Sequence, residues 1–354
     1  MASPLTLTKA RYAAAQSARV AWYMAHYSIT KSLAIKSAQT EPETLPKAAG
    51  FPQSPDPEGA RKAFLHAFEQ DLRNIEDGLY PAPRDFSVRA MARAIESSRL
   101  FLKDAAEVDA RRRRKGGREV PQRPNSAPDL PAYYLQNFHF QSGGWLTEES
   151  ARLYDTQVEV LFTGAADVMR RAALAEVGRE LRGRDQRHLR YLEAACGSGR
   201  FLRQTLDAFP RLNAEAFDLS PSYCEAARDS VHDWPHVQVS VADIVATPYA
   251  DASFNIAANI CLFHELPPPV RRQAAAELAR IIKPGGLLVF ADSVQRDDAP
   301  AFSASIERFP DLFHEPYYRS YLKTDLKALF AEAGFTPERE SVSFLTKVIA
   351  FRRA

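Results

Sequence analysis

From residue 189 onward, short apolar runs alternate with stretches of helical periodicity. Strands that alternate with helices must be joined by crossovers, and crossovers give a mostly parallel sheet. The tripeptide Phe344-Leu345-Thr346 between the last two runs is too short for a crossover, so these two runs should form an antiparallel hairpin. The sequence therefore predicts an α/β fold with a Rossmann-like, seven-stranded, mostly parallel sheet and an antiparallel last strand. The predicted strands are 190–195, 214–218, 236–241, 254–260, 287–292, 337–344 and 346–352.

The front part of the chain reads as helical. Helices are predicted at about 7–37, 59–78 and 86–114, and a fourth from Thr147 to about 178. Thr147 followed by two glutamates is typical of a helix start, because a hydroxyl caps the helix and carboxylates favour its positive end. Proline-rich segments at 41–57 and 121–131, and the basic run Arg111–Arg118, read as linkers. We expect residues 1–132 to form a helical extension and 133–354 a second domain.

Composition excludes several classes of protein. No run of about 18 apolar residues is present, so no transmembrane segment is predicted. The three cysteines fit neither a disulfide framework nor a zinc site, which favours a reducing, cytoplasmic location. The first 40 residues contain five Lys or Arg and no acid. This composition suits an organellar transit peptide or a structural helix, and both readings stay open.

The first candidate site is the segment after the first predicted strand. Gly197 and Gly199 permit a sharp turn and the close approach of a ligand, because glycine lacks a Cβ. The following helix begins at this turn, so its N-terminal N–H groups could bind an anion. A dinucleotide fingerprint that begins at Gly197 requires a third glycine at position 202, where the chain has Leu202. The turn therefore favours a smaller nucleoside without phosphates, such as S-adenosylmethionine.

Two acids continue this pattern. Asp218 ends the second predicted strand, where a carboxylate can accept hydrogen bonds from both ribose hydroxyls. Asp243 follows the third strand and could accept from an adenine amino group. The intervals from Glu193 to Asp218 and from Asp218 to Asp243 are both 25 residues, about one strand–helix unit. The three acids are therefore predicted along one edge of the sheet.

Together these motifs resemble the class I S-adenosylmethionine-dependent methyltransferases over residues 147–354. Leu192–Gly199 corresponds to the family's glycine-rich motif, and Ile281–Val289 to its turn into the fifth strand. Ala195 stands where the family usually has glycine, which alanine tolerates if its φ is negative. The resemblance implies S-adenosyl-L-methionine as cofactor and no metal. It also implies contacts to the cofactor from Glu193, Ala195, Cys196, Gly197, Gly199, Asp218, Leu219, Asp243, Ile244 and Asn259.

The methyl acceptor should bind beyond the fourth strand, where acceptors lie in this family. His264 is the first candidate for a general base, with Glu265 as the carboxylate that would orient it. A packing or capping role for this histidine is equally open. His314 and Tyr318, in the aromatic cluster 309–321, are further catalytic candidates. The aromatic residues could line a pocket for a lipophilic or aromatic small molecule, or could simply pack the front helices.

Two other functions stay open. The run Arg111–Arg118 could contact the phosphates of a nucleic acid, although such runs are usually solvated. Alternatively, the chain could be a cofactor-binding scaffold without turnover. Its first helix, with Trp22, Tyr23 and Tyr27, would then dock a partner or touch a membrane surface. The oligomeric state is not predicted.

Overall fold

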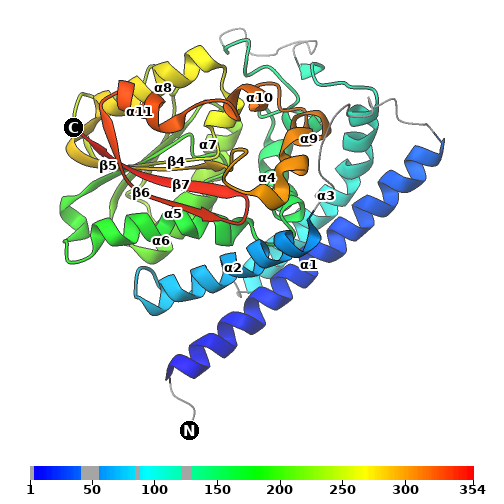
Figure 1. Ribbon diagram of the computed structural model, residues 1–354, viewed down its shortest axis with the longest axis horizontal. Helices are drawn as coiled ribbons and strands as arrows, with labels where there is room; N and C mark the ends of the chain where they lie inside the picture. Colours follow the sequence, from blue (N-terminus) through cyan, green and yellow to red (C-terminus); the bar gives the residue numbers. More distant parts are fainter. Residues whose placement is uncertain (1–3, 41–55, 84–87, 121–129) are drawn as a thin grey trace. The chain divides into compact units, whose positions relative to one another are not determined.

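The computed structural model describes residues 4–40, 56–83, 88–120 and 130–354, which form two compact units (Figure 1). The first unit comprises Met1–Pro55, Ala82–Asp167 and Ala304–Glu315. The second comprises Asp56–Pro81, Val168–Ser303 and Pro316–Ala354, and contains the sheet. The proline-rich stretches 41–55 and 121–129 lie outside the described residues. The predicted domain boundary at 132/133 stays a prediction.

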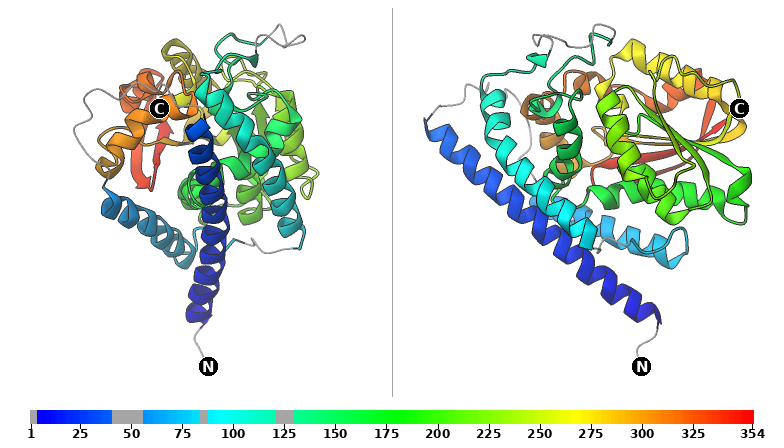
Figure 2. Two further views of the ribbon diagram at one scale, coloured as in Figure 1. Left: turned by 90° about the vertical axis from the view of Figure 1, so that its right-hand side faces the viewer. Right: turned by 180° about the vertical axis from the view of Figure 1, so that it is seen from behind.

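The helices of the first unit are α1 (Pro4–Thr40), α3 (Val88–Arg113), α4 (Glu148–Leu161) and nearly all of α9 (Ser303–Phe313), with the short 3₁₀ helix η2 (Phe138–Phe140). Helix α1 lies beside α3 in both views of Figure 2 and also contacts α4. No helix among the described residues is both long and apolar enough to cross a bilayer.

The second unit is a sheet with helices on both faces. Its helices are α2 (Pro57–Glu76), most of α5 (Ala166–Leu181), α6 (Arg200–Ala208), α7 (Pro221–Ser230), α8 (Pro268–Ile281), α10 (Tyr318–Tyr321) and α11 (Leu326–Glu332). Short 3₁₀ helices are η3 (Gln186–His188), η4 (Phe263–Glu265) and η5 (Pro300–Phe302). The strands are β1 (Arg190–Ala194), β2 (Asn213–Asp218), β3 (Gln238–Val241), β4 (Phe254–Ile260), β5 (Ile282–Ser293), β6 (Phe335–Ser343) and β7 (Thr346–Arg353).

The sheet confirms the predicted fold. Its strand order is β3-β2-β1-β4-β5-β7-β6. The pairs from β3 to β5 are parallel, whereas β7 is antiparallel to both β5 and β6. In the hairpin, β6 ends at Ser343 and β7 begins at Thr346, so only Phe344 and Leu345 separate the two strands.

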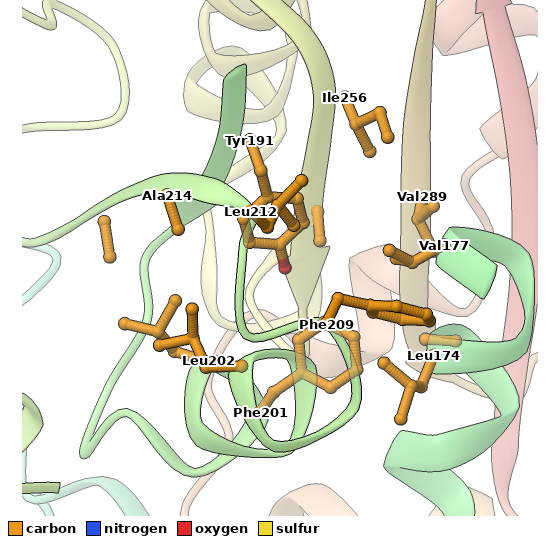
Figure 3. Close-up of a cluster of buried hydrophobic side chains, with 14 of the residues drawn as sticks. Leu174, Val177, Tyr191, Phe201, Leu202, Phe209, Leu212, Ala214, Ile256 and Val289 are labelled. Atoms are coloured by element: carbon orange, nitrogen blue, oxygen red, sulfur yellow. The ribbon is translucent and has the colours of Figure 1, made fainter. Parts of the chain in front are cut away.

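An apolar core fills both sides of the sheet. Helices α5 and α6 cover one face, with α8 and α11 on the other (Figure 1). Figure 3 shows the first face, where Leu174 and Val177 of α5 and Phe201 and Leu202 of α6 surround Tyr191 of β1. Leu202, the residue that replaces a fingerprint glycine, is fully buried there. Phenylalanines fill the opposite face, with successive ring contacts among Phe263, Phe290, Phe330, Phe335 and Phe351.

The single helix predicted from Thr147 to 178 is wrong, because the chain forms two helices there. Thr147 does cap α4, and its hydroxyl accepts from Ser150 N at 3.2 Å. The break follows Leu161, where Thr163 and Gly164 take φ values of +50° and +88°. Within the first unit, Arg19 pairs with Glu159 before the break and Asp167 after it, at 2.6 and 2.7 Å. Left-handed backbone cannot continue an α-helix, so this turn ends α4.

The first three residues of the run Arg111–Arg118 belong to helix α3, whereas Arg114, Lys115 and Arg118 are exposed. Arg111, only 3% exposed, lies in the last turn of α3 and donates to Phe140 O and Ser142 Oγ at 2.8 and 3.1 Å. It also pairs with Glu107 and Glu119, which pair with Arg114 as well. Arg112 and Arg113 both pair with Asp109. The acids that neutralise this run are thus close in sequence, and the cluster holds the end of α3 in place.

Helix α2 joins the sheet-containing unit through a buried ion pair. Asp71 on α2 and Arg171 on α5 are each 2% exposed, and two of their N–O distances are 2.6 and 2.8 Å. The Tyr80 hydroxyl donates to the same carboxylate at 2.7 Å. Burial and the Asp71 charge raise the pKa of Tyr80 well above its ordinary value, so the hydroxyl stays a donor. Asp71 therefore connects the end of α2 to the helix layer over the sheet.

Replacement of Asp71 by alanine should lower the free energy of unfolding by about 3–5 kcal/mol, because it leaves the buried Arg171 cation without its carboxylate. Chemical denaturation followed by circular dichroism would measure this. Glu58→Ala on the same helix is the control. It removes an exposed pair with Lys62 and should cost less than about 1 kcal/mol. Equal losses in the two variants would contradict the assigned role of Asp71.

Candidate functional site

The glycine-rich turn joins β1 to α6, and its two glycines have different roles. Gly197 has a φ of +54°, and a Cβ placed on it would meet no atom within 4 Å. Gly199 has a φ of +76°, and a Cβ there would lie 2.9 Å from Cα of Ala227 on α7. Gly197 therefore leaves open space beside the turn, whereas Gly199 allows α6 and α7 to pack closely.

Ala195 does not meet the condition of a negative φ under which alanine is tolerated at this position. Its φ is +57°, in the left-handed region that favours glycine. The turn imposes this conformation from both sides. Ala194 is the last residue of β1, and Cys196 N donates to Phe217 O at 2.9 Å. The backbone geometry of a glycine is thus kept although the residue is alanine.

Asp218, at the end of β2, organises the turn. Its Oδ2 accepts from Gly197 N and its Oδ1 from Ser220 N, both at 2.9 Å. Burial raises the pKa of Asp218, while the N–H groups of Ser220, Gly197 and Leu219 act in the opposite direction. Each carboxylate oxygen keeps a second lone pair, so Asp218 can still accept from a ligand.

Glu193 and Cys196 are buried below the turn. Glu193 is 2% exposed and accepts a hydrogen bond from the Leu202 backbone in the first turn of α6. Burial raises the pKa of the Glu193 carboxyl well above its ordinary value, and it also raises that of the Cys196 thiol. Glu193 thus contacts the start of α6 directly.

The predicted adenine side of the site lies after β3. Asp243 Oδ1 accepts from Val245 N at 3.1 Å, which forms a tight turn, and Ile244 is 5% exposed. Asp218 O accepts from Ala242 N at 3.0 Å, so the segments after β2 and β3 are held together. Leu219 is partly exposed at the same edge. The structure therefore brings Asp218, Asp243 and their neighbours to one edge of the sheet.

Asn259, the penultimate residue of β4, is fully buried beside the turn. It pairs in register with Ala194, and its Nδ2 donates to Ala194 O at 2.9 Å. Its Oδ1 is buried and has no hydrogen-bond partner among the described residues. A buried amide oxygen without a donor is costly, so this atom could accept from a ligand N–H.

His264 lies in η4 after β4, and its carboxylate partner is Asp292 of β5. His264 Nδ1 is 2.5 Å from Asp292 Oδ1, whereas the predicted partner, Glu265, is 3.8 Å from Nε2. Asp292 is fully buried, and its Oδ2 also accepts from Phe263 N at 2.7 Å. The carboxylate therefore fixes both the backbone of η4 and the orientation of the imidazole. Glu265 could contact the opposite nitrogen only after a small movement.

Two tyrosines pack edge-on against this imidazole. Tyr318 and Tyr321 of α10 have ring centroids 5.8 and 6.2 Å from that of His264. The Tyr318 hydroxyl lies 2.5 Å from Ser293 Oγ, and the Tyr321 hydroxyl donates to Ser293 O at 2.5 Å. Tyr318 thus lies beside His264, and its catalytic role stays a prediction.

Buried Arg271 stabilises the positions of η4 and α10 through hydrogen bonds. Its guanidinium, 1% exposed, donates to Phe263 O, Tyr317 O, Ser320 Oγ and Thr324 Oγ1 at 2.7–3.0 Å. Burial lowers the pKa of Arg271, and the nearby Asp292 carboxylate acts in the opposite direction. Arg271 thereby ties η4 to the α10 segment.

His314, the last catalytic candidate, belongs to the first unit. Its Nε2 lies 3.1 Å from Gln136 Oε1, and burial lowers its pKa. The predicted cluster 309–321 is thus split, with residues up to Glu315 in the first unit and those from Pro316 in the second.

Sequence reasoning missed Asp292, Ser293 and Arg271. Asp292 ends the predicted strand 287–292, the same position that singled out Asp218 in the second strand. Applied to every strand, that rule finds Asp292. Nothing in the sequence marks Arg271, which lies in a helix with several other arginines.

The comparisons with known proteins agree with this geometry. Residues 192–286 match a family described as a methyltransferase domain. This part of the chain is therefore similar to methyltransferase domains. An O-methyltransferase of Penicillium expansum is 30% identical over 174 residues, which are 48% of this chain and 59% of that protein. The match therefore spans less than two thirds of this relative.

Two further proteins are similar over about half of the chain. A malonyl-[acyl-carrier protein] O-methyltransferase of a Paenibacillus species is 28% identical, with 53% of this chain and 68% of that protein covered. Among solved structures, a geranyl diphosphate C-methyltransferase of Streptomyces coelicolor is 17% identical with a TM-score of 0.42, and the match covers 55% and 84% of the two chains.

Ala195→Gly should raise the free energy of unfolding by about 1 kcal/mol, because glycine removes the cost of a Cβ in the left-handed region. Ala194→Gly, one residue earlier in β1, is the matched control and should destabilise the domain. Urea denaturation of both variants would measure the difference. A destabilised Ala195→Gly variant would show that the turn does not hold a strained alanine.

Proposed function

We propose that the protein binds S-adenosyl-L-methionine at the β1–α6 turn and transfers its methyl group to a small molecule. The observation that supports this most strongly is the convergence of Gly197, Asp218 and Asn259 beside one open turn. Gly197 leaves space, Asp218 offers two acceptor oxygens, and Asn259 has a buried acceptor without a donor.

These residues fit the chemistry of the cofactor part by part. Asp218 would accept from the ribose hydroxyls and Asp243 from the adenine amino group, with Leu219 and Ile244 beside the base. Asn259 Oδ1 would accept from the methionine ammonium group, which satisfies the buried amide oxygen. S-adenosylmethionine has no phosphate groups. Its binding therefore does not require a third glycine at position 202, where the chain has Leu202. When bound, S-adenosylmethionine supplies a methyl group already activated on a sulfonium.

His264 is the proposed general base for the acceptor. Asp292 accepts from Nδ1, so Nε2 carries the lone pair and can take a proton from an acceptor hydroxyl. Asp292 would also stabilise the imidazolium that forms, and Arg271 would hold η4 and α10 in place through its hydrogen bonds. Tyr318 and Tyr321 would contribute aromatic walls and limit water. The two O-methyltransferase relatives support oxygen as the acceptor atom.

The nucleic-acid alternative loses its main support. Arg111, Arg112, Arg113 and Arg114 are engaged by Glu107, Asp109 and Glu119 of the same unit. To contact phosphates they would first have to break these pairs. The scaffold alternative would require that the His264–Asp292 pair has no catalytic use, which the second experiment below tests. A cytoplasmic location stays a prediction.

Asp218→Ala should weaken S-adenosylmethionine binding by at least about tenfold, because it removes charged acceptors worth about 1.5–3 kcal/mol each. Isothermal calorimetry would measure the affinity, and circular dichroism would verify folding. Asp207→Ala, which removes an exposed acid of α6, is the control and should bind as the parent does. Unchanged affinity in Asp218→Ala would refute the assigned cofactor site.

His264→Gln and Asp292→Asn should both lower kcat for methyl transfer by about 10²–10⁴-fold, the usual contribution of a general base. Their affinity for S-adenosylmethionine should be unchanged. Release of S-adenosylhomocysteine, measured with a panel of phenols, carboxylic acids and amines, would identify an acceptor and give the rates. Full activity of both variants toward such an acceptor would eliminate His264 as the base.

A further inference from the structure

We propose that His139 and Glu315, both in the first unit, bind a divalent transition-metal ion. Glu315 is 0% exposed and His139 is 7% exposed, so both groups are withdrawn from water. His139 Nε2 lies 3.0 Å from Glu315 Oε1. Both residues belong to the first unit, whereas the proposed cofactor residues and His264 belong to the second.

The polar atoms of this pair are not satisfied by each other. Neither Glu315 oxygen has a hydrogen-bond partner among the described residues, and His139 Nδ1 has none either. The close approach of Nε2 and Oε1 thus does not form an aligned hydrogen bond. An ionised carboxylate buried in this way is costly unless a cation balances it. Protonated His139 would supply one charge but would leave an N–H buried without an acceptor.

The spacing of the two atoms suits a shared metal ion. Bonds of about 2.1 Å from a metal to an imidazole nitrogen and a carboxylate oxygen, at a right angle, place those atoms about 3.0 Å apart. Imidazole with carboxylate is a ligand pair that favours Zn²⁺, Mn²⁺, Fe²⁺ or Co²⁺ over Mg²⁺. Water molecules would supply further ligands.

The surroundings hold the two ligands in place. The His139 ring stands edge-on to Trp145, Phe309 and Phe313, at centroid distances of 5.3, 6.5 and 6.3 Å. This apolar shell strengthens electrostatic attraction to a cation. Glu315 N donates to Pro310 O at 3.0 Å, which fixes the backbone after α9.

The backbone of His139 is fixed as well. It has a φ of +53°, followed by +56° at Phe140. Asn137 stabilises this turn, because its side chain accepts from Glu119 N and Val120 N and donates to Gln141 O at 2.8–3.0 Å. A non-glycine residue kept in a left-handed conformation, with its side chain buried against a carboxylate, is typical of a functional position.

Metal binding can be tested without cofactor or acceptor, so its outcome is independent of the proposed function. Co²⁺ is the probe, titrated into the full-length protein and followed by its visible absorption and by calorimetry. We expect one Co²⁺ per chain, bound at least ten times more weakly by His139→Gln and by Glu315→Gln. The control is His232→Gln, which alters an exposed His–Asp pair of similar spacing, 3.2 Å, and should bind as the parent does.

A second measurement leaves both ligands unchanged. In the variant Trp22→Phe/Trp234→Phe, Trp145 is the only tryptophan. Co²⁺ bound at His139 should quench its fluorescence, with saturation at one equivalent. Absence of quenching, absence of a bound ion in the parent, or equal affinity in His139→Gln and Glu315→Gln would each overturn the proposal and leave an ordinary His–Glu ion pair.

Discussion

Parallel pairing of β2, β1, β4 and β5 is the constraint on which the rest of the site depends. Ala194 of β1 pairs with Phe217 on one side and with Asn259 on the other, and Ile260 pairs with Ala291 of β5. This register brings the polar residues at the carboxyl ends of the strands to one edge. Asp218 follows Phe217, and Asp292 follows Ala291, so the two carboxylates lie at the same ends of strands that are separated by β1 and β4. Ligands bind at this edge in open α/β sheets.

Two groups of buried polar residues lie along this edge of the sheet. At the β1–α6 turn, backbone N–H groups are aimed at Asp218, and Asn259 connects β4 to β1. After β4, the Asp292 carboxylate binds both the imidazole and the backbone of η4. The first group leaves acceptor oxygens at the turn, and in the second group the sheet sets the orientation of the imidazole. One register error in β5 would turn Asp292 to the opposite face and remove this partner of His264.

Much of this arrangement follows from the sequence, because it depends on local patterns. Alternating apolar runs predicted the strands, and the short Phe344–Thr346 connection predicted the hairpin. The two 25-residue intervals predicted that Asp218 and Asp243 lie at the carboxyl ends of β2 and β3, where the structure has them, and their binding roles stay predictions. Other features could not be predicted from the sequence, because they depend on contacts between segments that are distant along the chain. The partner of His264 is 28 residues away, and the break between α4 and α5 is stabilised by Arg19, far earlier in the chain.

Helix α2 and the run Arg111–Arg118 also depend on contacts that sequence patterns do not reveal. The periodicity of α2 predicts a helix, but its grouping with the sheet depends on a pair 100 residues apart, Asp71 and Arg171. A run of four arginines suggests solvation, but Glu107, Asp109 and Glu119 neutralise it locally. The left-handed backbone conformation of Ala195 is imposed by the turn, because alanine itself disfavours a positive φ.

The central claim is that the cofactor binds where Gly197, Asp218 and Asn259 converge. A crystal structure of the protein with S-adenosylhomocysteine would test it most directly. The account predicts that the ribose hydroxyls donate to Asp218 and that the homocysteine ammonium lies within hydrogen-bond distance of Asn259 Oδ1. A ligand bound elsewhere, or one that leaves both side chains untouched, would contradict it.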